Sequence, residues 1–179
     1  MNSIFLILSE RIGKAISTVP SFANIQDLCL IISVYILFTL AWGWQGGFLH
    51  WQPQSGKIIF KVMLTSLIAP AILEELVFRV LLLPYPNPSI SLESYSIWSL
   101  FSLGLFIIYH PLNAITFFPQ GRSVFFRPVF LILAAALGIV CTITYWQTGS
   151  LWLPVIIHWI VVVLWLLCFG GLSQIASHE

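Results

Sequence analysis

The stretch ILEELVFRV, residues 72–80, decides how the chain can fold, because it places Glu74, Glu75 and Arg79 inside one of the most apolar segments. A Glu or Arg at the middle of a membrane span costs about 2.5–3.5 kcal/mol, so these three cost roughly 8–10 kcal/mol. The apolar side chains around them contribute only about 3–5 kcal/mol in the other direction. The charged side chains therefore need partners inside a folded bundle.

The composition predicts an integral membrane protein. The chain has 179 residues, of which 59% are hydrophobic and 7% are charged, and its mean hydropathy is +1.00. A soluble domain carries about 25% charged residues, so this chain cannot cover itself with a solvated surface. The net charge of +1 gives no reason to expect nucleic acid as a partner. The lipid bilayer is the expected surrounding, although the sequence does not indicate which membrane.

Five apolar segments are predicted to cross the bilayer, because each approaches the ~20 residues that a helix needs to cross hydrocarbon. They lie at about residues 28–44, 58–83, 95–109, 129–146 and 151–169. Residues 3–17 are apolar at first and then basic, which favours a helix lying in the membrane interface. We therefore expect an all-α membrane protein, a bundle of about five transmembrane helices plus an interfacial N-terminal helix.

The chain divides into four parts on this interpretation. The interfacial segment covers residues 1–25, and the first span with its linker covers 26–57. The main core covers 58–170, and a short polar tail covers 171–179.

The orientation in the membrane is left open by the basic residues. One side would carry Arg11 and Lys14, and the other would carry Lys57, Arg122 and Arg127. Cytoplasmic loops have an excess of Lys and Arg, but two residues against three do not decide which side is cytoplasmic.

The charged stretch contains one predicted ion pair. Glu75 and Arg79 are four residues apart, so they share a helix face and can pair. Glu74 is rotated by about 100° and points to other helices or to a water-filled cavity. Pro70 is expected to kink the helix one turn earlier. A purely structural alternative is that the pair staples the bundle and that Glu74 is only its neighbour.

Two histidines also lie at membrane depth. The motif FIIYHPLN places His110 four residues after Phe106, on the same helix face, and Pro111 is expected to disrupt the helix there. The motif LPVIIHWIVVV places His158 midway along the last span. A lone histidine in an apolar helix is usually a packing residue, but two of them with a pair of carboxylates favour a functional site.

Helix geometry allows these groups to meet. At 1.5 Å per residue, Glu74, His110 and His158 lie roughly 14, 20 and 12 Å from the same side of an alternating bundle. They can therefore converge near the middle of the membrane.

The motifs in this order resemble those of the CPBP family of intramembrane proteases, which includes type II CAAX prenyl endopeptidases and bacteriocin-immunity or processing proteins. EELVFR at 74–79 matches EExxxR, FIIYH at 106–110 matches FxxxH, and His158 follows in a late helix. The resemblance covers roughly residues 58–170. It implies an intramembrane peptidase that hydrolyses a peptide bond of a membrane-associated peptide or protein with a water activated by Glu and His.

The resemblance also implies roles for three catalytic residues. Glu74 would be the general base, His110 its partner, and His158 would help to form the oxyanion site. The family is compatible with a metal-free mechanism, in which no cofactor is needed. It is equally compatible with one zinc ion, because two histidines and one glutamate are a ligand set of zinc hydrolases.

Three further residues would support the site. Glu75 and Arg79 would order the helix and tune Glu74, and Phe106 belongs to the second motif. At one position the chain departs from the family, which has Asn or Asp where this sequence has Val162. The alternative function is therefore a non-catalytic member that acts as a scaffold, assembly or immunity protein on a membrane-protein partner.

Two other functions are less compatible with the motifs. His110 and His158 would be the axial ligands in a b-type haem protein, but haem gives no reason for EExxxR. A proton-coupled transporter would also place carboxylates in the membrane, but the five predicted spans show no repeated halves.

Overall fold

The computed structural model describes residues 3–176, and its regular elements are helices apart from an isolated bridge between Gln52 and Phe169. The elements are α1 (Ser3–Ser17), α2 (Phe22–Gln45), α3 (Ile58–Ser66), the π-helical η1 (Leu67–Ile72), α4 (Leu73–Glu75), the π-helical η2 (Leu76–Leu81), α5 (Leu92–Thr116), the 3-10 turn η3 (Pro119–Gly121), α6 (Arg122–Phe125), α7 (Pro128–Thr148), α8 (Trp152–Cys168) and α9 (Gly171–Ala176). The predicted all-α membrane fold is confirmed.

The spans differ in how they are built. Within residues 3–176, three helices are long and apolar enough to cross a membrane, namely α2 from Leu28 to Gln45, α5 and α7. Helix α8 is a shorter apolar helix of 17 residues. The remaining predicted span is not one helix but the run from α3 to η2, which is broken in the middle. The chain is a multi-pass integral membrane protein.

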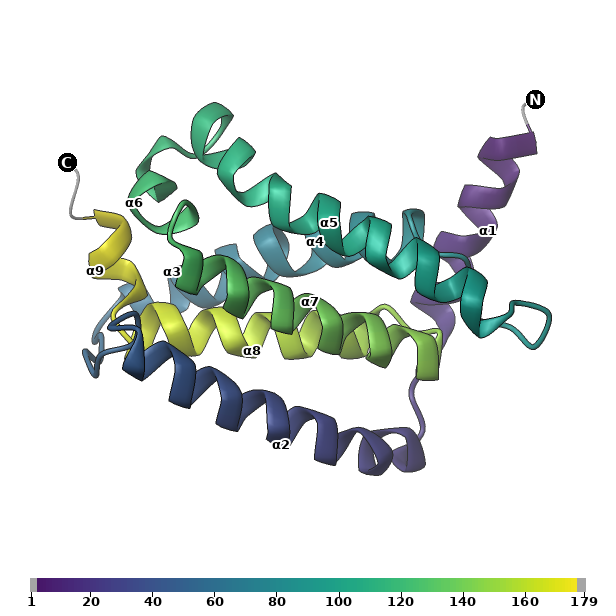
Figure 1. The fold of residues 1–179 in the computed structure, drawn as a ribbon, viewed down its shortest axis with the longest axis horizontal. Helices are drawn as coiled ribbons and strands as arrows, with labels where there is room; N and C mark the ends of the chain where they lie inside the picture. Colours follow the sequence, from purple (N-terminus) through teal and green to yellow (C-terminus); the bar gives the residue numbers. More distant parts are fainter. Residues whose placement is uncertain (1–2, 177–179) are drawn as a thin grey trace.

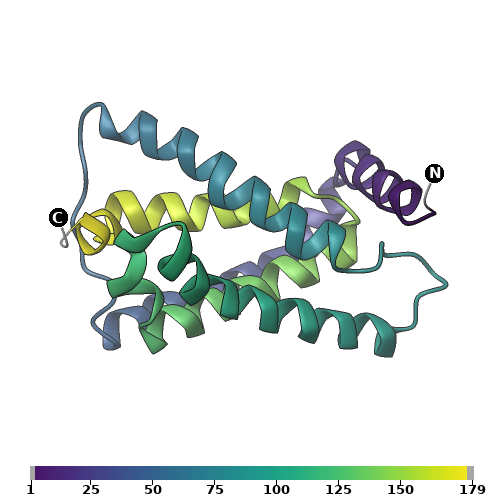
Figure 2. The same cartoon turned by 90° about the horizontal axis from the view of Figure 1, so that it is seen from above.

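Helix α7 lies at the centre of the bundle. It contacts α2, α5 and α8, and Figure 1 shows α2, α7 and α8 running side by side along the long axis. The run from α3 to η2 packs on α8, as the view in Figure 2 shows. The outer faces of α2 and α5 expose large apolar side chains such as Leu30, Leu37 and Leu100. Lipid rather than water is the natural contact for such faces.

The predicted kink before Glu74 is present. Ala69 has φ −132° and ψ 111°, which is outside the helical region. The ring of Pro70 excludes the residue before it from the α conformation, and Pro70 has no N–H to donate. The helix therefore breaks one turn before the charged residues, and a new helical turn begins with them.

The prediction that Pro111 disrupts its helix is wrong. Helix α5 continues through Pro111 to Thr116 and also begins earlier than predicted, at Leu92, where Ser91 Oγ accepts the N–H of Ser94 at 3.1 Å. A proline removes one N–H from a helix, and neighbouring side chains in a membrane bundle can bond the carbonyls that are freed. The carbonyl that loses its donor is that of Ile107, four residues before Pro111, whereas the ring of His110 bonds the carbonyl of Phe106.

The two ends of the chain add helices to the bundle. The predicted interfacial helix is α1, which packs on η2. The expected polar tail contains α9 over Gly171–Ala176, while residues 177–179 lie outside the described part of the chain.

Hydrogen bonds connect α1 to the start of α8 and to the residues after η2. The N–H of Leu151 donates to the carbonyl of Ala15 at 2.9 Å, and Trp152 Nε1 donates to the carbonyl of Ile16 at 2.8 Å. Arg11 Nη1 donates to the carbonyl of Leu83 at 3.3 Å, just after η2. Helix α1 is thus bonded both to the residues that follow η2 and to those at the start of α8.

Candidate functional site

The charged stretch is buried in the middle of the bundle. Glu74 and Glu75 form the single turn α4, and Arg79 follows in η2. Glu74 is 8% exposed, whereas Glu75 and Arg79 are fully buried. Burying charges in this way is unfavourable unless they are paired, so each of these side chains needs a partner.

Glu75 is held by two partners. Arg79 Nε lies 3.1 Å from Glu75 Oε2, which is the pair expected from the four-residue spacing. His158 Nδ1, from α8, donates to Glu75 Oε1 at 2.8 Å. The guanidinium of Arg79 also lies 5.1 Å from the centre of the Phe106 ring, which is within cation–π distance. Glu75 therefore ties α4, η2 and α8 together.

Glu74 lies on the other side of His158. Its Oε2 atom is 3.8 Å from His158 Nε2, so the imidazole stands between the two neighbouring carboxylates. Because a carboxylate only accepts hydrogen bonds, His158 Nδ1 must carry a proton to bond Glu75, and Nε2 is left facing Glu74. The sequence placed Glu74 toward another helix or a cavity, and the structure shows both.

His110 is fixed by its own helix. Its Nδ1 atom donates to the carbonyl of Phe106 at 2.8 Å, and its ring lies 4.8 Å from the Phe106 ring. A carbonyl only accepts, so the proton is on Nδ1 and Nε2 of the neutral ring keeps a free lone pair. The ring is enclosed by aromatic side chains, with Phe130 at 5.2 Å and Phe125 at 5.6 Å. His110 is therefore a rigid acceptor in an apolar setting.

One cavity connects these groups. It has a volume of about 710 Å³, and Glu74, His110, His158 and Phe106 all line it. Most of the other lining residues are apolar or aromatic, with Lys61, Thr65 and Asn113 among the few polar ones. Such a cavity can hold a confined water near two titratable side chains and an apolar ligand beyond them.

The net charge of the buried group determines how many protons it must hold. Two carboxylates and one guanidinium sum to −1 when His158 is neutral, from the charges of Glu74, Glu75 and Arg79. A buried net charge is unfavourable, so one added proton on Glu74 or His158 neutralises the group. Since Glu74 Oε2 and His158 Nε2 are 3.8 Å apart, this proton can move between them through a small shift or one water.

The zinc alternative depends on how the His, Cys, Asp and Glu side chains are arranged. A catalytic zinc needs three protein ligands at about 2 Å. Within residues 3–176 no group of three or more His, Cys, Asp and Glu side chains is arranged to hold a metal ion. His158 donates Nδ1–H to Glu75 and faces Glu74 with Nε2, and this arrangement also disfavours it as an axial haem ligand.

Some contributors to the site were missed in the sequence. Ser102 Oγ donates to the carbonyl of Phe78 at 2.6 Å and is fully buried. Its position could have been found, because residues 102, 106 and 110 repeat every four residues along one face of α5. Trp159 Nε1 donates to the carbonyl of Met63 at 2.8 Å, for which the sequence gives no signal.

Val162, the residue that departs from the family motif, also lines the cavity. It lies one turn after His158 on α8, so an apolar side chain stands where the motif would supply a polar one.

A family model described as type II CAAX prenyl endopeptidase Rce1-like matches residues 55–164. The match includes the run from α3 to η2, the whole of α5 and α7, and most of α8. No curated protein and no solved structure matches the chain.

Proposed function

Because the chain belongs to the Rce1-like family of type II CAAX prenyl endopeptidases, we propose that it hydrolyses a peptide bond of a membrane-associated peptide or protein within the bilayer. The observation that carries the proposal is that Glu74, His110 and His158 line one apolar cavity. The ion pair of Glu75 and Arg79 is fully buried, and Glu75 also bonds His158.

In the proposed reaction Glu74 is the general base. It takes a proton from a water while the water oxygen bonds the carbonyl carbon of the substrate. The C–N bond then breaks, and the proton passes from Glu74 to the leaving nitrogen. This hydrolysis needs no oxidant or cofactor, and no step passes through a metal. Addition of a chelator should therefore leave turnover unchanged.

The two histidines have different proposed roles. His110 offers a lone pair on Nε2, which positions the attacking water by accepting one of its hydrogens. His158 is fixed through Nδ1 by Glu75, so its Nε2 can donate to the developing oxyanion when it holds the mobile proton. Hydrogen bonds of this kind are worth more in a dry cavity than in water.

The test uses cells that lack the gene and are complemented with variant chains. Wild type should generate new peptide termini in the membrane proteome, and Glu74→Gln should generate none, because the amide cannot take a proton. Glu93→Gln is the matched control, since Glu93 is exposed at the start of α5. Equal sets of termini from wild type and from a properly folded Glu74→Gln chain would overturn the proposal.

A second candidate function is a non-catalytic scaffold, assembly or immunity protein that binds a membrane-protein partner. Val162 favours it, because the cavity lacks a polar side chain where the family motif has one. The same cells distinguish the two: a scaffold requires that Glu74→Gln restores the phenotype of the deletion fully, whereas a protease requires that it fails.

A further inference from the structure

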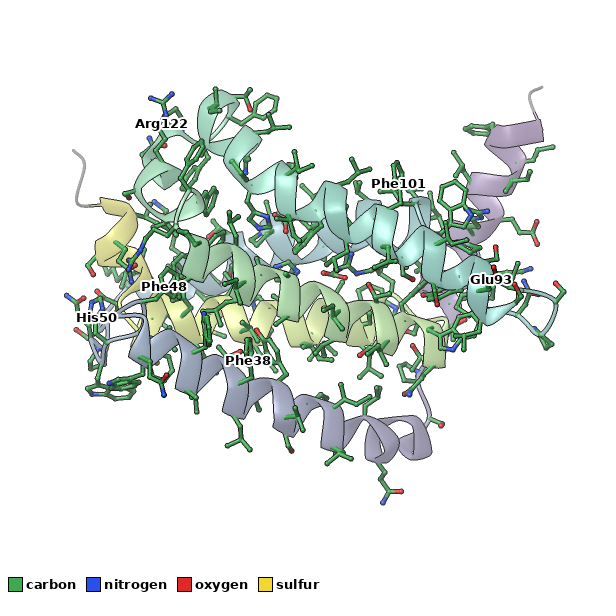
Figure 3. All side chains as sticks on the ribbon, in the orientation of Figure 1. Phe38, Phe48, His50, Glu93, Phe101 and Arg122 are labelled. Atoms are coloured by element: carbon green, nitrogen blue, oxygen red, sulfur yellow. The ribbon has the colours of Figure 1, made fainter. Side chains whose placement is uncertain are left out.

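The two ends of the bundle differ in charge. One end gathers the loop after α2, the segment with η3 and α6, and helix α9, which lie together on the left of Figure 1. Its basic residues are Lys57, Lys61, Arg122 and Arg127, and residues 44–66, 113–127 and 168–176 contain no Asp or Glu. We call this region the basic end. Figure 3 labels Arg122 there and Glu93 at the opposite end.

At the opposite end of the bundle, carboxylates offset the charges of the basic side chains. It holds α1, the loop after η2 and the turn between α7 and α8, with Glu10, Asp27 and Glu93 against Arg11 and Lys14. Its two basic residues are both engaged within the protein. Lys14 Nζ lies 2.6 Å from Glu10 Oε1, and Arg11 bonds the carbonyl of Leu83.

The ion pair of Lys14 with Glu10 changes the pKa of both side chains. The hydrogen bond and charge of Lys14 lower the pKa of the Glu10 carboxyl, and Glu10 in turn raises the pKa of Lys14. The positive charge of Lys14 is therefore balanced locally, whereas that of the basic end is not.

Exposed aromatic side chains surround the basic end. Trp44, Trp51, Phe117 and Phe126 are all exposed there. Phe126 and Arg122 also line a shallow open pocket. Exposed aromatic rings beside basic side chains are typical of the level of lipid headgroups, where an apolar body and a polar tip are both satisfied.

We propose that the basic end binds the anionic headgroups of the cytoplasmic leaflet, so that α1 lies at the other face of the membrane. Charge complementarity selects this occupant, because the basic residues are matched by no carboxylate of the described chain at that end. Arg127 is also engaged within the protein, by Gln174 and the carbonyl of Gly47, but three other basic residues are exposed at the basic end. These are Lys57, Lys61 and Arg122. With Arg11 and Lys14 engaged at the other end, the positive-inside rule gives the same orientation. The proposal does not depend on catalysis.

The first experiment measures lipid binding to the full chain in detergent. Native mass spectrometry gives the apparent dissociation constant for phosphatidylglycerol, with phosphatidylcholine as the neutral reference. The pair Lys57→Gln and Arg122→Gln should weaken phosphatidylglycerol binding by about fivefold per removed charge and leave phosphatidylcholine unchanged. Lys14→Gln is the matched control at the opposite end and should bind like wild type.

Two results would overturn the lipid site. One is equal affinity for the two lipids, and the other is the same loss in Lys14→Gln as in the basic-end variants. Glu74→Gln should keep full lipid binding, so failure of the proposed protease function would leave this measurement unaffected.

The second experiment tests the orientation in intact cells. Ser55→Cys places a thiol at the basic end and Ser94→Cys places one at the other end, and both serines are exposed. A membrane-impermeant maleimide should label Ser94→Cys directly but Ser55→Cys only after permeabilisation. The unsubstituted chain, with its free Cys29, Cys141 and Cys168, sets the background. Labelling of Ser55→Cys in intact cells would overturn the orientation.

Discussion

Glu74 and Glu75 are neighbours in the chain, but they belong to two different regions of the site. Glu75 lies in a closed region, where Arg79 and His158 hold its two oxygens at 3.1 and 2.8 Å. Glu74 lies in an open region, where it lines the cavity and has only the long 3.8 Å approach of His158 Nε2. A rotation of about 100° between successive helix positions is enough to separate them.

The contrast between Glu74 and Glu75 shows how a membrane protein can keep one buried carboxylate available to a cavity. The closed region supplies paired charges and hence a fixed geometry, while the open region keeps one carboxylate short of partners. His158 belongs to both regions, because one nitrogen bonds Glu75 and the other faces Glu74. The orientation of the imidazole in the open region is therefore set by the closed one.

Matched substitutions of the two carboxylates give the sharpest test of this division. Glu74→Gln should reduce turnover by about 10²–10⁴ with an unchanged melting temperature, because the proposed general base is lost but no short contact is removed. Glu75→Gln should lower the melting temperature in detergent, because Arg79 and His158 lose a charged partner. Similar melting temperatures for both variants would remove the distinction between the regions.

Arg79→Ala tests the closed region from the other partner. It leaves Glu75 buried without its ion pair, which typically costs about 3–5 kcal/mol of stability. The expected result is a low yield and a clearly lower melting temperature than that of Lys57→Ala, whose side chain is at the exposed basic end. Normal yield and unchanged melting would show that the pair does not stabilise the fold.

Val162→Asn tests whether the open region lacks a donor. An amide at this position faces the cavity and can bond the oxyanion, so turnover should rise by up to ~10²-fold. The rates of wild type and variant toward one identified substrate measure the effect, and Val162→Leu is the control for size. If the protein is a scaffold, neither wild type nor either variant shows turnover, and the unpaired amide lowers the melting temperature slightly.

Ser102→Ala is expected to have the smallest effect. It removes the donor to the carbonyl of Phe78, which costs about 1–1.5 kcal/mol when the acceptor is left buried. The melting temperature should fall modestly, whereas Ser96→Ala, at an exposed position of the same helix, should leave it unchanged. Equal melting of the two variants would show that Ser102 does not help to hold η2 in place.

The sequence was informative where chemistry follows spacing along one helix. The ion pair of Glu75 with Arg79 and the break before Pro70 both follow from local geometry. The bridging position of His158 could not be derived, because its partners come from a helix more than 80 residues away along the chain. The continuation of α5 through Pro111 could not be predicted from the local sequence either, because a proline is tolerated in a membrane helix when the surrounding bundle supports the helix.

The docking of α1 has a consequence for the order in which the protein is made. The backbone carbonyls of Ala15 and Ile16, and of Thr18 just after the helix, bond groups at residues 150–152, which lie more than 130 positions later in the chain. A ribosome releases the N-terminal part first. Helix α1 must therefore remain at the membrane without its hydrogen-bonding partners until nearly the whole chain has been synthesised. Its exposed Phe5, Leu6 and Ile7 give it a surface on which to rest in lipid during that interval.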